Sequence, residues 1–260
     1  MTANSKIRLG LDVLATVAAV GACGILLYFN WGKIFPPQAP VPQSPLALDG
    51  ASLKGSAEAP VVVVAYSDYV CPFCAKAERE VMPEIQKQYI ATGRVQLAFR
   101  QHPLEKLHPG ATRAAVAALC AGEQGRFWEM HDALFRDPKN IDEADLLTRV
   151  RSLHLDEQRF IACGQGQAVT QVQRDVKEAE DLRLGGTPVF LIGRRQSDGR
   201  VRVLSIIDGA HPIEVFRKQI EAAAVPESRH FGAILASAFA AIGAGMWFWS
   251  KNKRKEEVTA

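Results

Sequence analysis

The most informative residues of this chain are two cysteines separated by two others, in the segment Cys71-Pro-Phe-Cys74. Directly before them, residues 61–66 read Val-Val-Val-Val-Ala-Tyr, a β-branched run that predicts a buried strand. Directly after them, the pattern is helical and continues towards Ile90. A C-x-x-C pair where a strand passes into a helix is typical of thiol–disulfide chemistry.

The spacing predicts different chemical roles for the two thiols. Cys71 falls at the helix N-cap, and Pro72 falls at the first helical position, where a missing N–H costs nothing. Unpaired amide groups and the positive end of the helix dipole favour a thiolate, so we expect Cys71 to be the nucleophile, with its pKa below ~8.5. Cys74 would resolve a mixed disulfide by attacking the sulfur of Cys71. Phe73 supplies no positive charge to the thiolate.

Two alternatives for this motif stay open, a purely structural disulfide and half of a zinc site. Zinc requires four ligands, and the sequence contains no second C-x-x-C or C-x-x-H. We therefore expect neither a metal nor an organic cofactor.

A second motif, Gly185-Gly-Thr-Pro-Val-Phe190, precedes another apolar run. With Cys-Pro-x-Cys at a helix start, it resembles the DsbA family of thioredoxin-fold proteins over roughly residues 50–225. Three intervening segments share the resemblance: Arg100-Gln-His-Pro-Leu, His108-Pro-Gly-Ala and Gln124-Gly-Arg-Phe-Trp-Glu-Met-His-Asp-Ala-Leu-Phe135. The resemblance implies a cis peptide bond at Pro188 beside Cys71, with Thr187 offering backbone hydrogen bonds to substrate. The alternative is an ordinary trans proline that opens a strand.

The expected fold class is α/β, a thioredoxin fold with an inserted helical domain at about 103–184. The insertion is predicted from apolar residues at helical spacing, in segments 112–122, 126–135, 141–153 and 168–184. Strands are predicted on both sides of it, at 94–99, 189–192 and 201–207, the last two as an antiparallel hairpin. A final helix is expected at 211–224, and the charged segment 174–183 is predicted to be a solvated helix face.

Two further cysteines, Cys120 and Cys163, both fall in the helical block. Outside the cytoplasm they are expected to pair as a structural disulfide. Two buried free thiols are the alternative.

Asp68, three residues before Cys71, is a candidate for proton relay to the cysteines. It could equally cap its loop as an Asx-turn. The histidines share no metal-ligand spacing, and none is assigned a catalytic role.

Both ends of the chain resemble membrane spans. Residues 9–31 and 231–249 are long and apolar, and each borders basic tails, 1–8 and 250–260. The positive-inside rule then predicts a bacterial plasma-membrane protein with both termini cytoplasmic and residues 50–226 outside, behind a proline-rich linker at 32–49. The alternatives are a cleaved signal peptide, lipidation at Cys23, and a buried core helix at the C-terminal end.

Composition narrows the classes further. The chain is 260 residues long, 48% hydrophobic and 23% charged, which is ordinary for a globular protein. Its net charge of +3 belongs to the two tails, so no nucleic-acid partner is expected.

These observations predict a membrane-anchored thiol–disulfide oxidoreductase that passes the Cys71–Cys74 disulfide to thiol-containing client proteins. By resemblance, a membrane quinone reductase of the DsbB type would reoxidise it. The direction stays open between an oxidase and a reductase or isomerase. A module of thioredoxin fold that binds metal or clients without turnover is the alternative from another class.

Overall fold

The computed structural model describes residue 16, residues 19–26 and residues 39–225. Residues 19–26 are helical and belong to a unit of their own, Met1–Ala39. Among these described residues, no helix is both long and apolar enough to cross a bilayer. The predicted span 231–249 and most of 9–31 lie outside the described residues.

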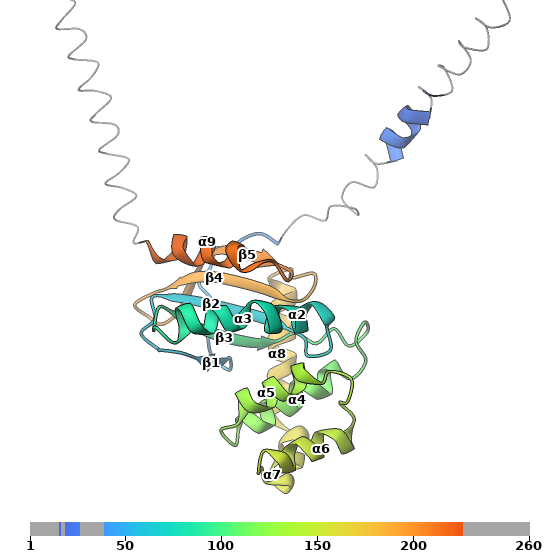
Figure 1. Ribbon diagram of the computed structural model, residues 1–260, viewed down its shortest axis with the longest axis vertical. Helices are drawn as coiled ribbons and strands as arrows, with labels where there is room; N and C mark the ends of the chain where they lie inside the picture. The colour runs from blue at the N-terminus through green and yellow to red at the C-terminus, as the bar shows by residue number, and fades with distance from the viewer. Residues whose placement is uncertain (1–15, 17–18, 27–38, 226–260) are drawn as a thin grey trace, which may run out of the picture. The chain divides into compact units, whose positions relative to one another are not determined.

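The second unit is built on a five-stranded sheet with the order β1-β3-β2-β4-β5 (Figure 1). Only β2 and β3 pair in parallel, and the other neighbours are antiparallel. The strands are β1 (Ser52–Lys54), β2 (Val61–Ser67), β3 (Val95–Gln101), β4 (Val189–Arg195) and β5 (Val201–Asp208). β2 and β3 are buried along their whole length. The run of four valines in β2 is typical of a strand covered on both faces, whereas β3 also buries Gln96, Arg100 and Gln101.

The helices fall into three groups. Those packed close to the sheet are α2 (Pro72–Glu80), α3 (Met82–Ile85), the π-helical turn η1 (Gln86–Ile90) and α9 (Ile213–Ala224). The insertion between β3 and β4 comprises α4 (Ala111–Gly122), α5 (Phe127–Arg136), α6 (Glu143–Ser152) and α7 (Glu157–Gly164). α8 (Gln167–Asp181) returns the chain from the insertion to the sheet. This arrangement confirms the predicted α/β fold with a helical insertion.

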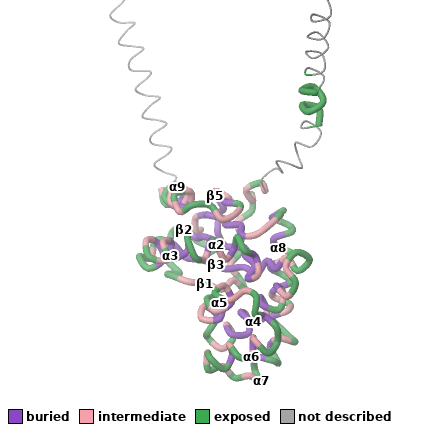
Figure 2. The backbone as a smooth tube through the Cα atoms, turned by 45° about the vertical axis from the view of Figure 1, so that its right-hand side comes forward, coloured by how far each residue is buried: buried purple, intermediate pink, exposed green. Residues whose placement is uncertain are grey.

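Alternate residues of β2 point to opposite faces of the sheet. Val61, Val63 and Ala65 join the main core cluster, together with residues of α2, α9 and the insertion. Tyr66 lies on the opposite face, where its hydroxyl donates to Glu178 of α8 at 2.7 Å. Figure 2 shows the resulting concentration of buried residues in the strands.

The helix that follows the cysteines does not run unbroken to Ile90. It ends at Val81 and restarts as α3, in which Pro83 occupies the first turn. Proline has no N–H to bond to the carbonyl four residues earlier, and its ring clashes there, so the helix cannot continue regularly through this point.

Two other expectations are corrected. The segment 174–183 is not simply a solvated face, because Asp175 is 1% exposed and receives a hydrogen bond from Arg100 at 2.9 Å. The segment 32–49 is not free linker to its end. Leu46 pairs with Val201 at the start of β5, and the Arg100 guanidinium donates to the carbonyls of Ala47 and Asp49.

Candidate functional site

The cysteine pair lies where β2 leaves the sheet and α2 begins. Cys71 is the N-cap of α2 with extended backbone angles, and Pro72 follows in the first turn. The amide of Cys71 donates to the carbonyl of Asp68 at 3.2 Å, which closes the turn between the strand and the helix. Cys71 is 3% exposed and Cys74 is fully buried, and both are free thiols.

The pKa values of the two thiols are shifted in opposite directions. The hydrogen bond from the Cys74 thiol, supported by Thr187 and by the backbone N–H groups of Phe73 and Cys74, lowers the pKa of Cys71 to about 5. Those N–H groups belong to the first turn of α2 and have no helical acceptor of their own. Burial raises the pKa of Cys74 well above its ordinary value. The site therefore holds one thiolate and one thiol at neutral pH, which is what nucleophilic attack followed by resolution requires.

Thr187 and Pro188 follow the helical insertion in the sequence and complete the site. Their peptide bond is cis. When Cys71 is protonated, its thiol donates to the carbonyl of Thr187 at 3.4 Å, so residues separated by more than a hundred positions meet at this site. Val189 directly after them begins β4 and pairs with Tyr66 of β2. This pairing fixes the Thr187–Pro188 loop beside the end of β2.

Asp68 is buried beneath this site, and its carboxylate makes the Asx-turn contact considered for it, whereas proton relay to the cysteines stays a prediction. One carboxylate oxygen accepts from the amide of Val70 at 2.8 Å, which is an Asx-turn. The other accepts from the amide of Leu104 and lies 2.7 Å from Nδ1 of His108. The backbone N–H of Asp68 donates to the Cys74 sulfur at 3.4 Å.

His108 had no role in the sequence analysis, yet it connects Asp68 to the surface. The spacing of the histidines could not reveal it, because a pairing across forty residues leaves no local pattern. Its segment, His108-Pro-Gly-Ala, did appear among the segments that resemble DsbA-like proteins. Among the described residues, no group of three or more histidine, cysteine or acidic residues is arranged to hold a metal ion.

The remaining predicted residues are Phe73, between the two redox cysteines, and a second pair of cysteines in the insertion. Phe73, between the cysteines, is 63% exposed, so an apolar side chain stands in solvent beside the buried sulfur of Cys71. Cys120 and Cys163 lie in the insertion, where the structure joins them in a disulfide with Cα atoms 5.6 Å apart. That disulfide links α4 to α7.

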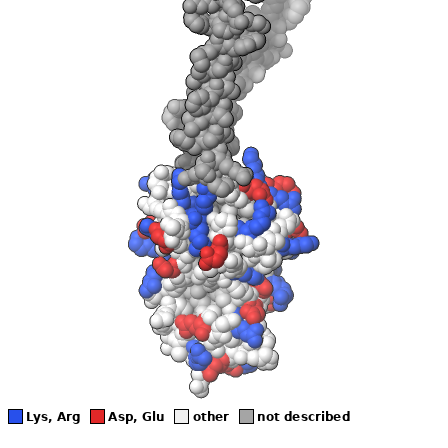
Figure 3. Space-filling view, turned by 90° about the vertical axis from the view of Figure 1, so that its left-hand side faces the viewer, with Lys and Arg blue, Asp and Glu red and all other residues white. Residues whose placement is uncertain are grey.

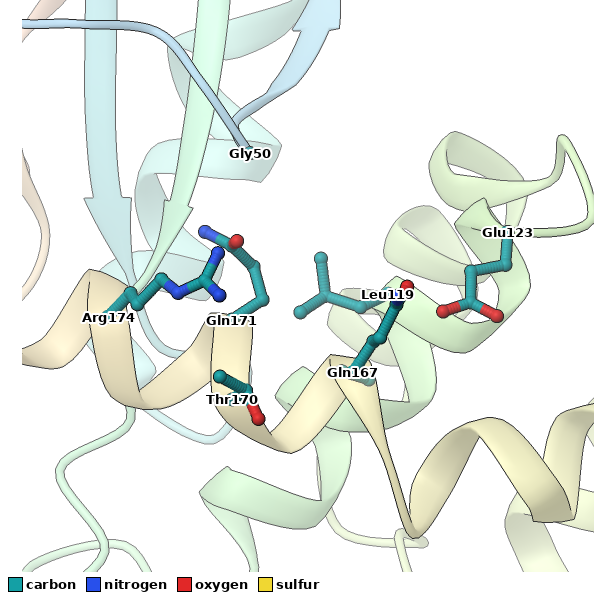
Figure 4. A pocket seen from close by; sticks show the side chains of 8 residues that line it. Gly50, Leu119, Glu123, Gln167, Thr170, Gln171 and Arg174 are labelled. Atoms are coloured by element: carbon teal, nitrogen blue, oxygen red, sulfur yellow. The ribbon is translucent and has the colours of Figure 1, made fainter.

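A pocket of about 440 Å³ lies elsewhere, between α4, α8 and the residues before β1 (Figure 4). Arg174 and Glu123 stand at opposite ends of it, with Gln171 between them. None of the predicted site residues lines this pocket, so the cysteine pair is not part of it.

Comparison with known proteins decides the family. The thioredoxin family profile matches residues 49–222, which is about two thirds of the chain. The chain belongs to the thioredoxin family. Within that family, the crystal structure of α-DsbA1 from Wolbachia pipientis superposes with a TM-score of 0.59 at 23% identity, covering 69% of this chain and 93% of the other. The predicted likeness to DsbA-like thioredoxin-fold proteins is confirmed.

Two curated relatives match parts of this chain. The "Probable disulfide bond formation protein D" of Bacillus anthracis is 29% identical over 142 residues, which cover 52% of this chain and 65% of that protein. The "Na(+)/H(+) antiporter NhaA 3" of Salinispora tropica is 37% identical over 158 residues, which cover 60% of this chain. Those residues make up only 23% of the antiporter, so this chain spans about a quarter of that relative.

Proposed function

We propose that this thioredoxin-family protein is an extracytoplasmic thiol–disulfide oxidoreductase that introduces disulfides into client proteins. The observation that carries the proposal is the Cys71 sulfur, which lies at the N-terminus of α2 and against the carbonyl of Thr187. In the reaction, a client thiolate attacks the Cys71–Cys74 disulfide at Cys71 and releases the Cys74 thiolate, which takes up a proton. A second client thiolate then attacks the client sulfur of the mixed disulfide. The client leaves oxidised, and Cys71 leaves as a thiolate.

The low pKa of Cys71 supports the oxidising direction. A stabilised thiolate favours the reduced form of the pair, so electrons flow from the client into the protein. The mixed disulfide is correspondingly reactive, because the Cys71 thiolate is a good leaving group when the second client thiolate attacks the client sulfur.

Membrane anchoring is part of the proposal. The apolar segments 9–31 and 231–249, with basic residues beside them, support two spans with both termini in the cytoplasm. A quinone reductase of the DsbB type in the same membrane would accept the electrons and restore the Cys71–Cys74 disulfide.

The reduction potential of the purified full-length protein in glutathione buffers tests the direction. We expect a value near that of DsbA, about −120 mV, and far from that of thioredoxin, about −270 mV. A Cys71→Ser variant is the control, since it cannot form the disulfide. A potential near the thioredoxin value would identify a reductase or isomerase instead. A pair that does not titrate would leave only a binding module.

A further inference from the structure

Both ends of the described thioredoxin unit are held at the hairpin formed by β4 and β5. At the beginning, Leu46 and Val201 exchange two backbone hydrogen bonds of 2.9 and 2.8 Å. At the end, the guanidinium of Arg194 donates to the carbonyls of Ala223, the last residue but one of α9, and of Val225, its C-cap. The chain therefore enters and leaves the domain beside the same pair of strands.

The hairpin is the most basic short segment of the domain. Residues 193–203 contain four arginines and one aspartate. Arg194 and Arg195 donate to neutral carbonyl and carboxamide oxygens, which do not cancel their charge. Arg200 is exposed and pairs with Asp198 at 2.7 Å, and Arg202 is exposed on β5. Figure 3, which looks onto this end of the sheet, shows basic side chains over it with acidic ones among them.

If the proposed C-terminal span exists, the short connection to it keeps the hairpin end of the domain near the bilayer. Five residues, 226–230, separate Val225 from the first residue of the predicted span 231–249. Even fully extended, that connection reaches only about 20 Å. A connection this short lets the basic surface come within the roughly 8–10 Å over which charges interact at ordinary ionic strength.

The redox site lies at the other end of the sheet. Val61 at the start of β2 stands opposite Arg194, and the strand then runs seven residues away from the hairpin to Ser67. At about 3.3 Å per residue, this places the turn before Cys71 roughly 20 Å from the level of Arg194. In Figure 1, α2 begins at the end of β2 that is opposite the hairpin.

We propose that the β4–β5 hairpin, residues 193–203, is a docking surface for anionic phospholipid headgroups. Docking there holds the thioredoxin unit with Cys71 directed away from the bilayer, towards client proteins. This inference rests on the membrane anchoring proposed above, and it adds an orientation that anchoring alone does not supply. It also means that a membrane-embedded redox partner must extend out of the bilayer to reach Cys71.

The experiment uses the full-length protein in lipid nanodiscs and measures backbone hydrogen exchange by mass spectrometry. One set of discs contains phosphatidylcholine alone, and the other contains equal parts of phosphatidylcholine and phosphatidylglycerol. We expect exchange in the hairpin to slow roughly fivefold or more in the anionic discs, the factor expected for one basic side chain near an anionic surface. High salt should abolish the difference, because at 1 M it shortens the screening length to about 3 Å.

The test variant combines Arg200→Gln and Arg202→Gln and should lose the protection. The matched control combines Arg151→Gln and Arg159→Gln, two exposed arginines of the insertion, of which Arg151 is likewise ion-paired, and should keep it. Equal exchange in the two kinds of disc would overturn the docking surface. The same would follow if the control pair lost protection as fully as the hairpin pair.

The redox proposal is tested separately on the same samples. None of the substituted arginines belongs to the cysteine site, so the reduction potential should not change. A protein that does not enter the discs refutes both the anchor and the docking surface. A protein that enters the discs but shows no thiol–disulfide exchange refutes the oxidoreductase and leaves the hairpin result standing.

Discussion

At the scale of single residues, the division of labour between Cys71 and Cys74 depends on their surroundings more than on their identity. Each is a cysteine of α2 or its cap, separated by one helical turn. Cys71 has the amides of that turn and the Cys74 thiol to stabilise a negative charge, whereas Cys74 is enclosed. The same chemical group is therefore a thiolate at one position and a thiol at the other.

The pH dependence of Cys71 is the first prediction. Thiolate absorbance in the ultraviolet should titrate with a midpoint at about 5 in the reduced protein. Since this folded-state pKa lies below that of an unfolded cysteine, about 8.5, the thiolate stabilises the reduced fold above the unfolded value. That contribution should disappear as the pH falls towards 5.

Cys74→Ser provides the comparison for this titration. The hydrogen bond from the Cys74 thiol makes the largest contribution to the low pKa of Cys71. Because a serine hydroxyl is a different donor, the midpoint of the Cys71 titration should move. The absorbance change should be absent from Cys71→Ser. A midpoint near 9 in the unsubstituted protein would contradict the stabilised thiolate.

Asp68→Asn tests what the buried carboxylate holds together. The substitution removes one acceptor oxygen from a group that serves Val70, Leu104 and His108. We expect the free energy of unfolding in denaturant to fall by about 1–3 kcal/mol, the cost of leaving a buried donor unpaired. Asp198→Asn, in an exposed turn, is the control and should change stability by less than about 0.5 kcal/mol.

The kinetics of the same variant separate the two roles of Asp68. If the carboxylate only shapes the turn, the rate at which the Cys71 mixed disulfide resolves should fall only as far as the fold is destabilised. A rate that falls while the fold is intact, and that changes its pH profile, would identify proton relay.

At the scale of elements, the strongest local patterns were predictable. The strand before the cysteines, the helix after them, the hairpin and the helical insertion all carry their own periodicity or turn signals. β1 has only three residues, and α7 is a short helix, so neither gives a periodic signal. The break at Val81 required weighing Pro83 against an otherwise helical pattern.

The contacts of α8 show what the sequence could not supply. Its charged residues look solvated along the chain, but Asp175 and Glu178 meet Arg100 of β3, which is seventy-five residues from Asp175. A buried ion pair has no local pattern, because each partner alone resembles a surface residue. The same reason explains why the pairing of Asp68 with His108 escaped prediction, although each residue is visible in the sequence.

Removing Arg100 should be severe. Arg100→Met leaves the buried Asp175 without its cation and frees the carbonyls of Ala47 and Asp49. We expect a loss of about 3–5 kcal/mol in the free energy of unfolding, measured in denaturant. Arg100→Met with Asp175→Leu should recover part of that loss, since the uncompensated charge is gone. No recovery in the double variant would show that the backbone contacts dominate.

The disulfide of the insertion acts on a different element. Cys120 and Cys163 are 43 residues apart, and replacing both with alanine should lower the free energy of unfolding by about 4 kcal/mol in the chain-entropy model. Thermal unfolding of the oxidised proteins measures this. The reduction potential of Cys71–Cys74 should stay the same, and a large change in it would mean that the insertion and the redox site are coupled.

At the scale of the whole molecule, the proposed topology places the folded unit outside the cytoplasm and both tails inside it. Protease added to spheroplasts should digest residues 50–225 and leave a tag after residue 260 protected, because the basic tails stay on the cytoplasmic side. Permeabilised cells, in which the tag is also digested, are the control. A tag digested in intact spheroplasts would refute the two-span arrangement.

Because the β4–β5 hairpin holds both ends of the domain, such a domain can be combined with other polypeptides during evolution. A folded unit whose entry and exit lie together can be appended to, or set within, a larger polypeptide without forcing the host to rearrange. The matched residues of the Salinispora relative make up 23% of that protein, so they are part of a much longer chain. The contacts of Leu46, Arg194 and Val201 therefore mark the place at which the domain can be joined to another polypeptide as one piece.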